Sequence, residues 1–147
     1  MAKLHLDDFL PYRLSIVSNA VSDAIASTYQ ALFGLRIPEW RLIAVIAETS
    51  GMTPQAVTHA TRMDKVTVSR AAAALAKRAL VERWPNPDDQ RSHSLSLTPA
   101  GRALYDQVAP KALEMEARLF GGLSANEQKQ FRDLIARIEA AAGGLEG

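Results

Sequence analysis

The sequence contains no cysteine, few aromatic residues and no long hydrophobic run. The absence of cysteine excludes a disulfide framework, a thiolate metal site and a thiol redox switch. The longest uninterrupted aliphatic run, Leu42 to Ala47, is far too short to span a bilayer. Asp7 and Asp8 lie where a secretory signal would be apolar. We therefore expect a cytoplasmic protein with no membrane partner.

Motifs for catalysis and metal binding are also missing. His5, His59 and His93 are isolated from one another in the sequence. Neither a phosphate-binding glycine loop nor a Gly-x-Ser-x-Gly motif occurs. The sequence predicts no enzyme, no metal site and no cofactor.

The net charge of +1 hides an uneven distribution of charged residues. Between Arg62 and Arg91, seven cationic residues stand against four acidic ones, which leaves a net charge of −2 on the rest of the chain. A local basic region on a near-neutral chain is typical of a nucleic-acid footprint, although the solvated face of a helix gives the same count. With 147 residues the chain can bury one core, so we expect a single compact unit.

Helical periodicity and capping signals predict helices along most of the chain. The predicted helices cover residues 7–32, 38–50, 54–61, 65–79, 99–120 and 125–142. Pro110 predicts a kink in the fifth of them, and the tail 143–147 is expected to fray. Extended runs on either side of a turn-rich segment, 86–92, predict a β-hairpin. The fold class is therefore mostly α with one small hairpin.

The helices at 54–61 and 65–79 form a helix-turn-helix pattern, with Thr53 and Asp64 as their N-caps. At about 100° per residue, one face of the second helix is predicted to be exposed and the opposite face buried. The exposed stripe consists of Val66, Arg70, Ala73 and Lys77. The buried stripe consists of Val68, Ala72, Leu75 and Ala79.

The exposed stripe carries the chemistry that reads DNA in the major groove. Arg70 can donate two hydrogen bonds to guanine, and Val66 can contact a thymine methyl group. The hydroxyls of Thr67 and Ser69 suit phosphates or base edges. An ordinary amphipathic helix with a capped start would show the same pattern, so the hairpin that follows is informative.

A charged loop between two strands, directly after such a helix, is typical of a wing. Arg91 at its tip can enter a narrow, electronegative minor groove, and Asp89 is placed to orient it. The alternative is a surface ion pair between them, worth under about 1 kcal/mol.

The segment Met63 to Gly101, with "MDKVTVSR", "LVER" and "NPDDQRSHSLSLTPAG", resembles the core of the multiple-antibiotic-resistance regulator (MarR) family of winged-helix transcription factors. The matching motifs are Thr67-Val68-Ser69-Arg70, the wing Asp89-x-Arg91, Leu95-x-Leu97-Thr98, and Gly101. The resemblance implies one MarR-like unit over 1–147, with a winged helix-turn-helix lobe at 36–98 and dimerisation helices at 1–34 and 99–147. It further implies a homodimer on a pseudo-palindromic operator in double-stranded DNA.

Three positions depart from the family pattern. Arg62 and Ala79 stand where the family often has glycine, so these turns are expected to be shaped differently, or Arg62 to add a phosphate contact. Gln90 stands where a second wing arginine is common, which predicts a weaker minor-groove grip. The predicted DNA-binding residues are Thr53, Arg62, Lys65, Val66, Thr67, Ser69, Arg70, Lys77, Asp89, Gln90 and Arg91.

The terminal helices carry more apolar surface than a small lobe needs for its own core, which favours a dimer over an isolated helical pair. These apolar residues are Leu6, Phe9, Leu10, Ile16, Leu119, Phe120, Phe131, Leu134 and Ile138.

The resemblance also implies a small-molecule pocket between the dimer helices and the DNA-binding lobe. Arg13, Asn19 and Trp40 are the candidate ligand residues, for a small aromatic or phenolic acid or its thioester. The alternatives are that Trp40 belongs to the core and that Arg13 and Asn19 are surface residues. The predicted function is a sequence-specific DNA-binding transcriptional regulator, a repressor released by such a ligand. The alternative is a winged-helix protein-interaction module or a ligand-independent DNA-architectural protein.

Overall fold

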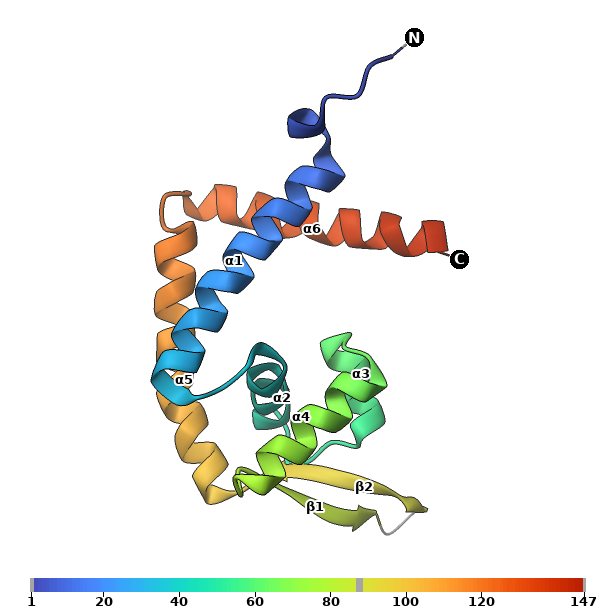
Figure 1. The fold of residues 1–147 in the computed structure, drawn as a ribbon, viewed down its shortest axis with the longest axis vertical. Coiled ribbons are helices and arrows are strands. Elements are labelled where there is room, and N and C mark those ends of the chain that lie inside the picture. Colours follow the sequence, from blue (N-terminus) through green and yellow to red (C-terminus); the bar gives the residue numbers. More distant parts are fainter. Residues whose placement is uncertain (1, 87–88, 147) are drawn as a thin grey trace. The chain divides into compact units, whose positions relative to one another are not determined.

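The computed structural model describes residues 2–86 and 89–146, without the side chains of 86, 89–92 and 146 (Figure 1). The elements are η1 (Leu6–Asp8), α1 (Leu10–Phe33), α2 (Ile37–Ala47), α3 (Pro54–Thr61), α4 (Lys65–Lys77), β1 (Val81–Asn86), β2 (Asp89–Leu97), α5 (Pro99–Phe120) and α6 (Ala125–Glu146). The chain forms two compact units, Met1–Lys111 and Ala112–Gly147. A mostly helical fold with one antiparallel hairpin is confirmed. Within the described ranges, no helix is both long and apolar enough to cross a bilayer.

Local capping signals set the helix boundaries where the sequence predicts them. The hydroxyl of Thr53 accepts a hydrogen bond from the Ala56 amide (3.1 Å), which caps α3. Ser124 and Glu127 exchange the two hydrogen bonds of a capping box at the start of α6 (3.1 and 2.8 Å). Such caps satisfy amide groups that have no partner inside their own helix, so they can be identified without tertiary information.

Several element boundaries differ from the sequence prediction. Helix α6 continues through Gly143 and Gly144 to Glu146, because glycine lowers helix propensity without forbidding the helix. The strands extend to Asn86 and from Asp89, so most of the predicted loop at 86–92 is strand. Helix α5 has its predicted bounds and continues across Pro110, which removes only one backbone hydrogen bond.

The core of the first unit lies between α2, α3, α4 and the base of the hairpin (Figure 1). Its fully buried side chains include Leu42, Ile43, Ile46, Val57, Val68, Leu75 and Leu95. Leu95 of β2 also forms an isolated antiparallel bridge with Met52, just before α3. The Met52 amide donates to the Leu95 carbonyl (2.9 Å), and the Leu95 amide donates to the Met52 carbonyl (2.6 Å). The bridge attaches the hairpin to the start of α3.

The hairpin is attached to α5 by the motif residues Thr98 and Gly101. The Thr98 hydroxyl donates to the carbonyl of Ala79 (2.7 Å) and accepts from the Gly101 amide (3.0 Å). The Thr98 amide donates to the carbonyl of Leu80 (3.1 Å). Gly101 packs directly against that carbonyl, and a Cβ atom there would overlap its oxygen. The close approach explains why glycine occupies this position.

Candidate DNA-binding interface

The turn between α3 and α4 is left-handed at Arg62, which has φ of 58°. Ala79, after α4, has φ of 59°. The prediction that these turns are shaped differently is therefore wrong: both residues adopt the backbone that glycine favours, at a cost of about 1–2 kcal/mol each. Ala79 is also exposed rather than part of the buried stripe, because α4 ends at Lys77 and the chain leaves the helix before Ala79.

Helix α4 begins at a tight cap formed by Asp64 and Thr67. One carboxylate oxygen of Asp64 accepts from the Thr67 amide (2.8 Å), and the other accepts from the Thr67 hydroxyl (2.8 Å). These hydrogen bonds, first from the amide and then from the hydroxyl, lower the pKa of Asp64. Because its proton is directed at Asp64, the Thr67 hydroxyl can accept a further hydrogen bond but has no proton left to donate.

The two faces of α4 differ as the periodicity predicts. Val68, Ala72 and Leu75 are at most 3% exposed and face the core. Val66 on the opposite face is 57% exposed, although it is a valine. The other members of this stripe and its neighbours are also exposed: Lys65, Ser69, Arg70, Ala73 and Lys77. The structure thus brings an apolar side chain, a hydroxyl and an arginine together on the outer side of the first turns of α4.

The remaining predicted DNA-binding residues divide into two groups. Thr53 is half-buried at its cap, and Arg62 is exposed in the turn between the helices. The side chains of Asp89, Gln90 and Arg91 lie outside the described residues, as does all of Asp88, so the wing prediction concerns residues that the structure does not describe. Their backbone belongs to β2 from Asp89 onward, and the strand register shifts between Pro85 and Asn86.

A groove of about 450 Å³ lies between α3, α4 and the hairpin. Val68, Ala72 and Leu95 form its apolar lining, Lys65 and Arg83 bring cationic groups to it, and His93 brings an imidazole ring. Arg83 and His93 were not among the predicted site residues. The signal that could have identified them is the strand alternation, because both share the face of the hairpin that buries Leu95.

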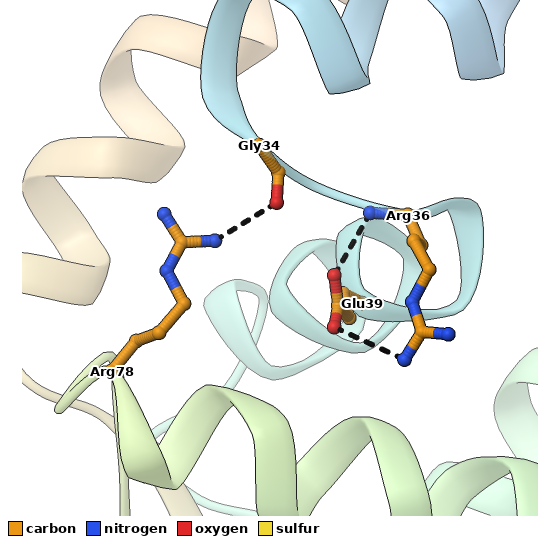
Figure 2. Close-up of polar contacts among 4 residues, drawn as sticks. All are labelled: Gly34, Arg36, Glu39 and Arg78. Carbon is orange, nitrogen blue, oxygen red and sulfur yellow. Dashed lines mark hydrogen bonds and ion pairs between the residues drawn. The ribbon is translucent and has the colours of Figure 1, made fainter.

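Arg78, the residue after α4, connects the end of that helix to the end of α1 (Figure 2). Its guanidinium group donates to the carbonyls of Gly34 and Phe33, both at 3.2 Å. Carbonyls at a helix C-terminus carry partial negative charge, so a guanidinium group suits them. Because the contact spans 44 residues of sequence, no local pattern predicted it.

The start of α2 lies beside this contact and is held by Arg36 and Glu39. Glu39 accepts a hydrogen bond from the Arg36 amide (2.8 Å), and the two side chains form an ion pair at 3.7 Å (Figure 2). Glu39 is only 6% exposed although it is a carboxylate. The short connection between α1 and α2 is thus fixed at both sides.

The three predicted ligand residues do not come together within one chain. Trp40 is half-buried, with its ring edge-on to Tyr29 (5.4 Å) and stacked on Tyr105 of α5 (6.1 Å). Arg13 and Asn19 are exposed on α1. At about 1.5 Å of rise per residue, Arg13 lies roughly 24 Å along α1 from Tyr29, the residue that contacts Trp40.

Trp40 packs against both tyrosines and is still half-buried, so part of its surface remains accessible. Burial of the neighbouring Tyr29 raises the pKa of its hydroxyl. In the described part of the chain, no group of three or more histidine or acidic side chains could hold a metal ion.

A helix-turn-helix whose second helix presents this surface, followed by a hairpin anchored to the same core, defines a winged helix-turn-helix DNA-binding protein. The sequence model of the MarR family matches residues 33–92. The chain belongs to the MarR family, whose members are transcription regulators and not enzymes.

Individual relatives agree with this assignment. The transcriptional regulator HosA of Escherichia coli O111:H- is 27% identical over 101 residues, which are 69% of this chain and 75% of HosA. The structure of a probable transcriptional regulator from Pseudomonas aeruginosa is 30% identical, with a TM-score of 0.79, and the similarity covers 91% of this chain and 99% of that one. Sco3205 from Streptomyces coelicolor, solved in complex with DNA, shares the fold with a TM-score of 0.86 at 20% identity, over 96% of this chain and 91% of that one.

Proposed function

We propose that the protein is a homodimeric transcriptional repressor that places α4 in the major groove at each half of a pseudo-palindromic operator. The observation that carries the proposal is the exposed stripe of α4, in which Val66 and Arg70 face outward from the first turns of a firmly capped helix. In a helix-turn-helix these turns reach the base edges. Arg70 would read guanine and Val66 a thymine methyl group.

The experiment that tests this proposal is a binding titration with purified protein. Duplexes selected from a random library by the wild-type protein provide the operator, and fluorescence anisotropy then gives its affinity relative to a scrambled duplex. Arg41→Ala, which removes an exposed arginine from α2, is the matched control for charge. Wild-type protein that selects no sequence would refute the proposal.

Arg91 is proposed as the minor-groove contact of the wing, oriented by Asp89. Replacing Arg91 by alanine should lower the salt slope of binding by about one unit for each subunit, since one cation near the phosphates is lost. Asp89→Ala should produce part of this effect. A salt slope that Arg91→Ala leaves unchanged would place the wing in solvent.

The dimer is proposed because each terminal region exposes apolar side chains to water, which is energetically unfavourable. On the N-terminal side these are Leu6, Phe9, Leu10, Leu14, Ile16 and Val17. On α6 they are Phe131, Leu134, Ile135 and Ile138. Full burial of one such side chain stabilises an assembly by about 1.5–3 kcal/mol, so a second copy of the chain is the natural cover.

Dimerisation also explains how two small lobes share one operator, since half-sites one helical turn apart need two recognition helices at a fixed distance. Leu134→Glu combined with Ile138→Glu should give a monomer that has lost operator affinity. Sedimentation of the wild-type protein as a monomer at micromolar concentration would contradict the dimer.

Release by a small aromatic acid or its thioester is the second part of the proposal. The half-buried stack of Trp40 on Tyr105 supports it, because it provides aromatic surface at the side of the lobe. CouR from Rhodococcus jostii RHA1, which is 25% identical with a TM-score of 0.82, was solved bound to p-coumaroyl-CoA. Since Arg13 and Asn19 are distant from Trp40 along α1, they would serve such a ligand from the second copy of the chain.

A ligand releases DNA only if it binds the DNA-incompetent arrangement more tightly, and tenfold release needs about 1.4 kcal/mol of difference. Arg13→Ala should abolish release while DNA binding remains. If a panel of phenolic and aromatic acids neither shifts the melting temperature nor displaces operator DNA, the proposed release by a ligand is refuted, and the proposed DNA binding still stands. The protein would then be a ligand-independent DNA-binding protein.

A further inference from the structure

The connection between α1 and α2 contains one residue at which the backbone can turn easily. Gly34 follows α1 directly and has φ of 63° and ψ of 28°, in the left-handed region that glycine adopts without strain. A Cβ atom there would meet nothing within 4 Å, so packing around the residue does not restrict it. Leu35, the next residue, is completely buried in the core. Gly34 is therefore the point at which the direction of α1 relative to the lobe is set.

Arg78 contacts the two peptide groups on either side of this hinge. The carbonyl of Phe33 belongs to the peptide bond before Gly34, and the carbonyl of Gly34 belongs to the peptide bond after it. Each accepts a hydrogen bond from the Arg78 guanidinium group at 3.2 Å, and Figure 2 shows the one to Gly34. Because φ and ψ of a residue are the rotations of its two flanking peptide planes, a group bonded to both planes holds both angles.

The amides of the same two peptide groups are bonded within α1. The Gly34 amide donates to the carbonyl of Gln30 (3.1 Å), and the Leu35 amide donates to the carbonyl of Tyr29 (3.3 Å). Each peptide group is thus held from α1 through its amide and from α4 through its carbonyl. Without Arg78 only the cap would remain, and helix ends fray.

Arg102 of α5 makes the same kind of contact at a place without such a hinge. Its guanidinium group donates two hydrogen bonds, both of 3.3 Å, to the carbonyl of Ala47 at the end of α2. The start of α5 is already attached to the lobe by the hydrogen bonds of Thr98 and the close packing of Gly101. Loss of Arg102 would leave that attachment intact, so Arg102 is a matched control for Arg78.

We propose that Arg78 is a positioning residue that locks the Gly34 hinge and thereby sets the spacing of the two α4 helices in the dimer, a proposal that rests on the function proposed above. Arg78 is the C-cap residue of α4, so the contact joins the hinge directly to the helix that reads DNA. In a dimer joined through the terminal helices, the place of each lobe follows from the direction in which α1 enters it. Release of Arg78 lets the lobe rotate about Gly34.

The first test compares operators whose half-site spacing differs by one base pair, which turns one half-site by about 34–36° relative to the other. The measured quantity is the ratio of affinities for the selected and the altered spacing. If the altered spacing opens the Arg78 contact in each subunit, at roughly fivefold per contact, Arg78→Ala should lower this ratio by up to about twenty-fivefold.

The ratio separates a positioning role from a general loss of stability, because unfolding lowers both affinities alike. Arg102→Ala removes the same charge and the same type of hydrogen bond, and it should keep the ratio of the wild type. A wild-type ratio in Arg78→Ala would overturn the proposal, and so would an equal fall of the ratio in Arg102→Ala.

The second test measures the hinge without DNA. The chain contains no cysteine, so Gln30→Cys on α1 and His59→Cys on α3 introduce two exposed sites for nitroxide labels. Labelled chains diluted with excess unlabelled protein give the distance within one chain by double electron–electron resonance, in a monomer as well as in a dimer. Arg78→Ala should broaden the distance distribution, and Arg102→Ala should not. A width that Arg78→Ala leaves unchanged would overturn the proposal.

A variant of Gly34 tests the hinge itself. Asparagine adopts the left-handed backbone more readily than most residues that carry a side chain, but it has less conformational freedom than glycine. The open space around Gly34 accepts its side chain. Gly34→Asn combined with Arg78→Ala should therefore narrow the distance distribution again and restore part of the spacing preference. A combined variant as broad as Arg78→Ala alone would overturn the assignment of Gly34 as the hinge.

The two tests distinguish the failure of this proposal from the failure of the proposed function. Wild-type protein that selects no operator overturns the proposed function, and the label distances then decide alone whether Arg78 locks the hinge. Selective binding by the wild type, together with an unchanged spacing preference and an unchanged distance distribution in Arg78→Ala, overturns only the positioning role.

Discussion

Replacing Gly101 by alanine should destabilise the protein by acting on the junction between the hairpin and α5. The added Cβ would overlap the carbonyl oxygen of Leu80, far inside the 3.0 Å that real Cβ atoms keep. That carbonyl is backbone, already accepts from the Thr98 amide, and belongs to a residue that is only 7% exposed, so it cannot move away easily.

The magnitude follows from two opposing contributions. Inserting a methyl group into a tightly packed site costs about 1–3 kcal/mol, and contact with backbone places this case at or above the upper end. Alanine recovers up to about 1 kcal/mol through its better helix propensity. A net loss of about 2 kcal/mol should lower the melting temperature by roughly 4–8 °C.

Thermal and urea unfolding measure this effect directly. The matched control is Gly143→Ala in α6, where an added Cβ meets nothing within 4 Å and helix propensity alone predicts a small gain in stability. DNA affinity of Gly101→Ala should be measured well below its melting temperature, to separate folding from binding. A Gly101→Ala protein as stable as the wild type would refute the packing argument.

Three further predictions concern the ends and surroundings of α4. Ala79→Gly should stabilise the protein by about 0.5–1 kcal/mol in urea unfolding, because the strain energy removed from the left-handed backbone exceeds the cost of the greater entropy that glycine gives the unfolded chain. A loss of stability would contradict this. Arg78→Ala should free the end of α4 from the Phe33 and Gly34 carbonyls, and the dimer should then tolerate operators whose half-site spacing is changed by one base pair; a spacing preference like that of the wild type would argue against it. The ionised carboxylate of Asp64 should stabilise the fold fully above its ordinary pKa of 3.8, and this stabilisation should be lost as the pH falls through its lowered pKa in the folded protein. Asp64→Asn should therefore make stability depend less on pH in that range, and an acid unfolding profile with the same pH dependence as the wild type would contradict this.

Much of the fold follows from local features of the sequence. Thr53 and Asp64 cap their helices through amides within three residues, so their effect is visible without tertiary contacts. The buried and exposed faces of α4 follow from helical periodicity in the same way. The left-handed backbone at Ala79 was missed because alanine rarely adopts it, and only the surrounding contacts impose it.

The features that escaped sequence reasoning depend on distant parts of the chain. Arg78 meets carbonyls more than 40 residues away, and nothing near it in sequence marks that contact. The residue types of Trp40 and Arg13 suit an aromatic acid, but their distance along α1 within one chain cannot be read from residue type. The composition of the basic region marks Arg83 only as a cation, and the alternation of the hairpin is needed to assign it to the groove face.

The most direct test of the central claim is the sequence selectivity of Arg70→Ala, measured as the ratio of affinities for the selected operator and for a scrambled duplex. The wild type should select a pseudo-palindrome whose half-sites lie one helical turn apart. Arg70→Ala should then lose about 1–3 kcal/mol of specific binding while its affinity for the scrambled duplex changes little. Full-strength, sequence-selective binding by Arg70→Ala would contradict the assignment of α4 as the element that reads the DNA.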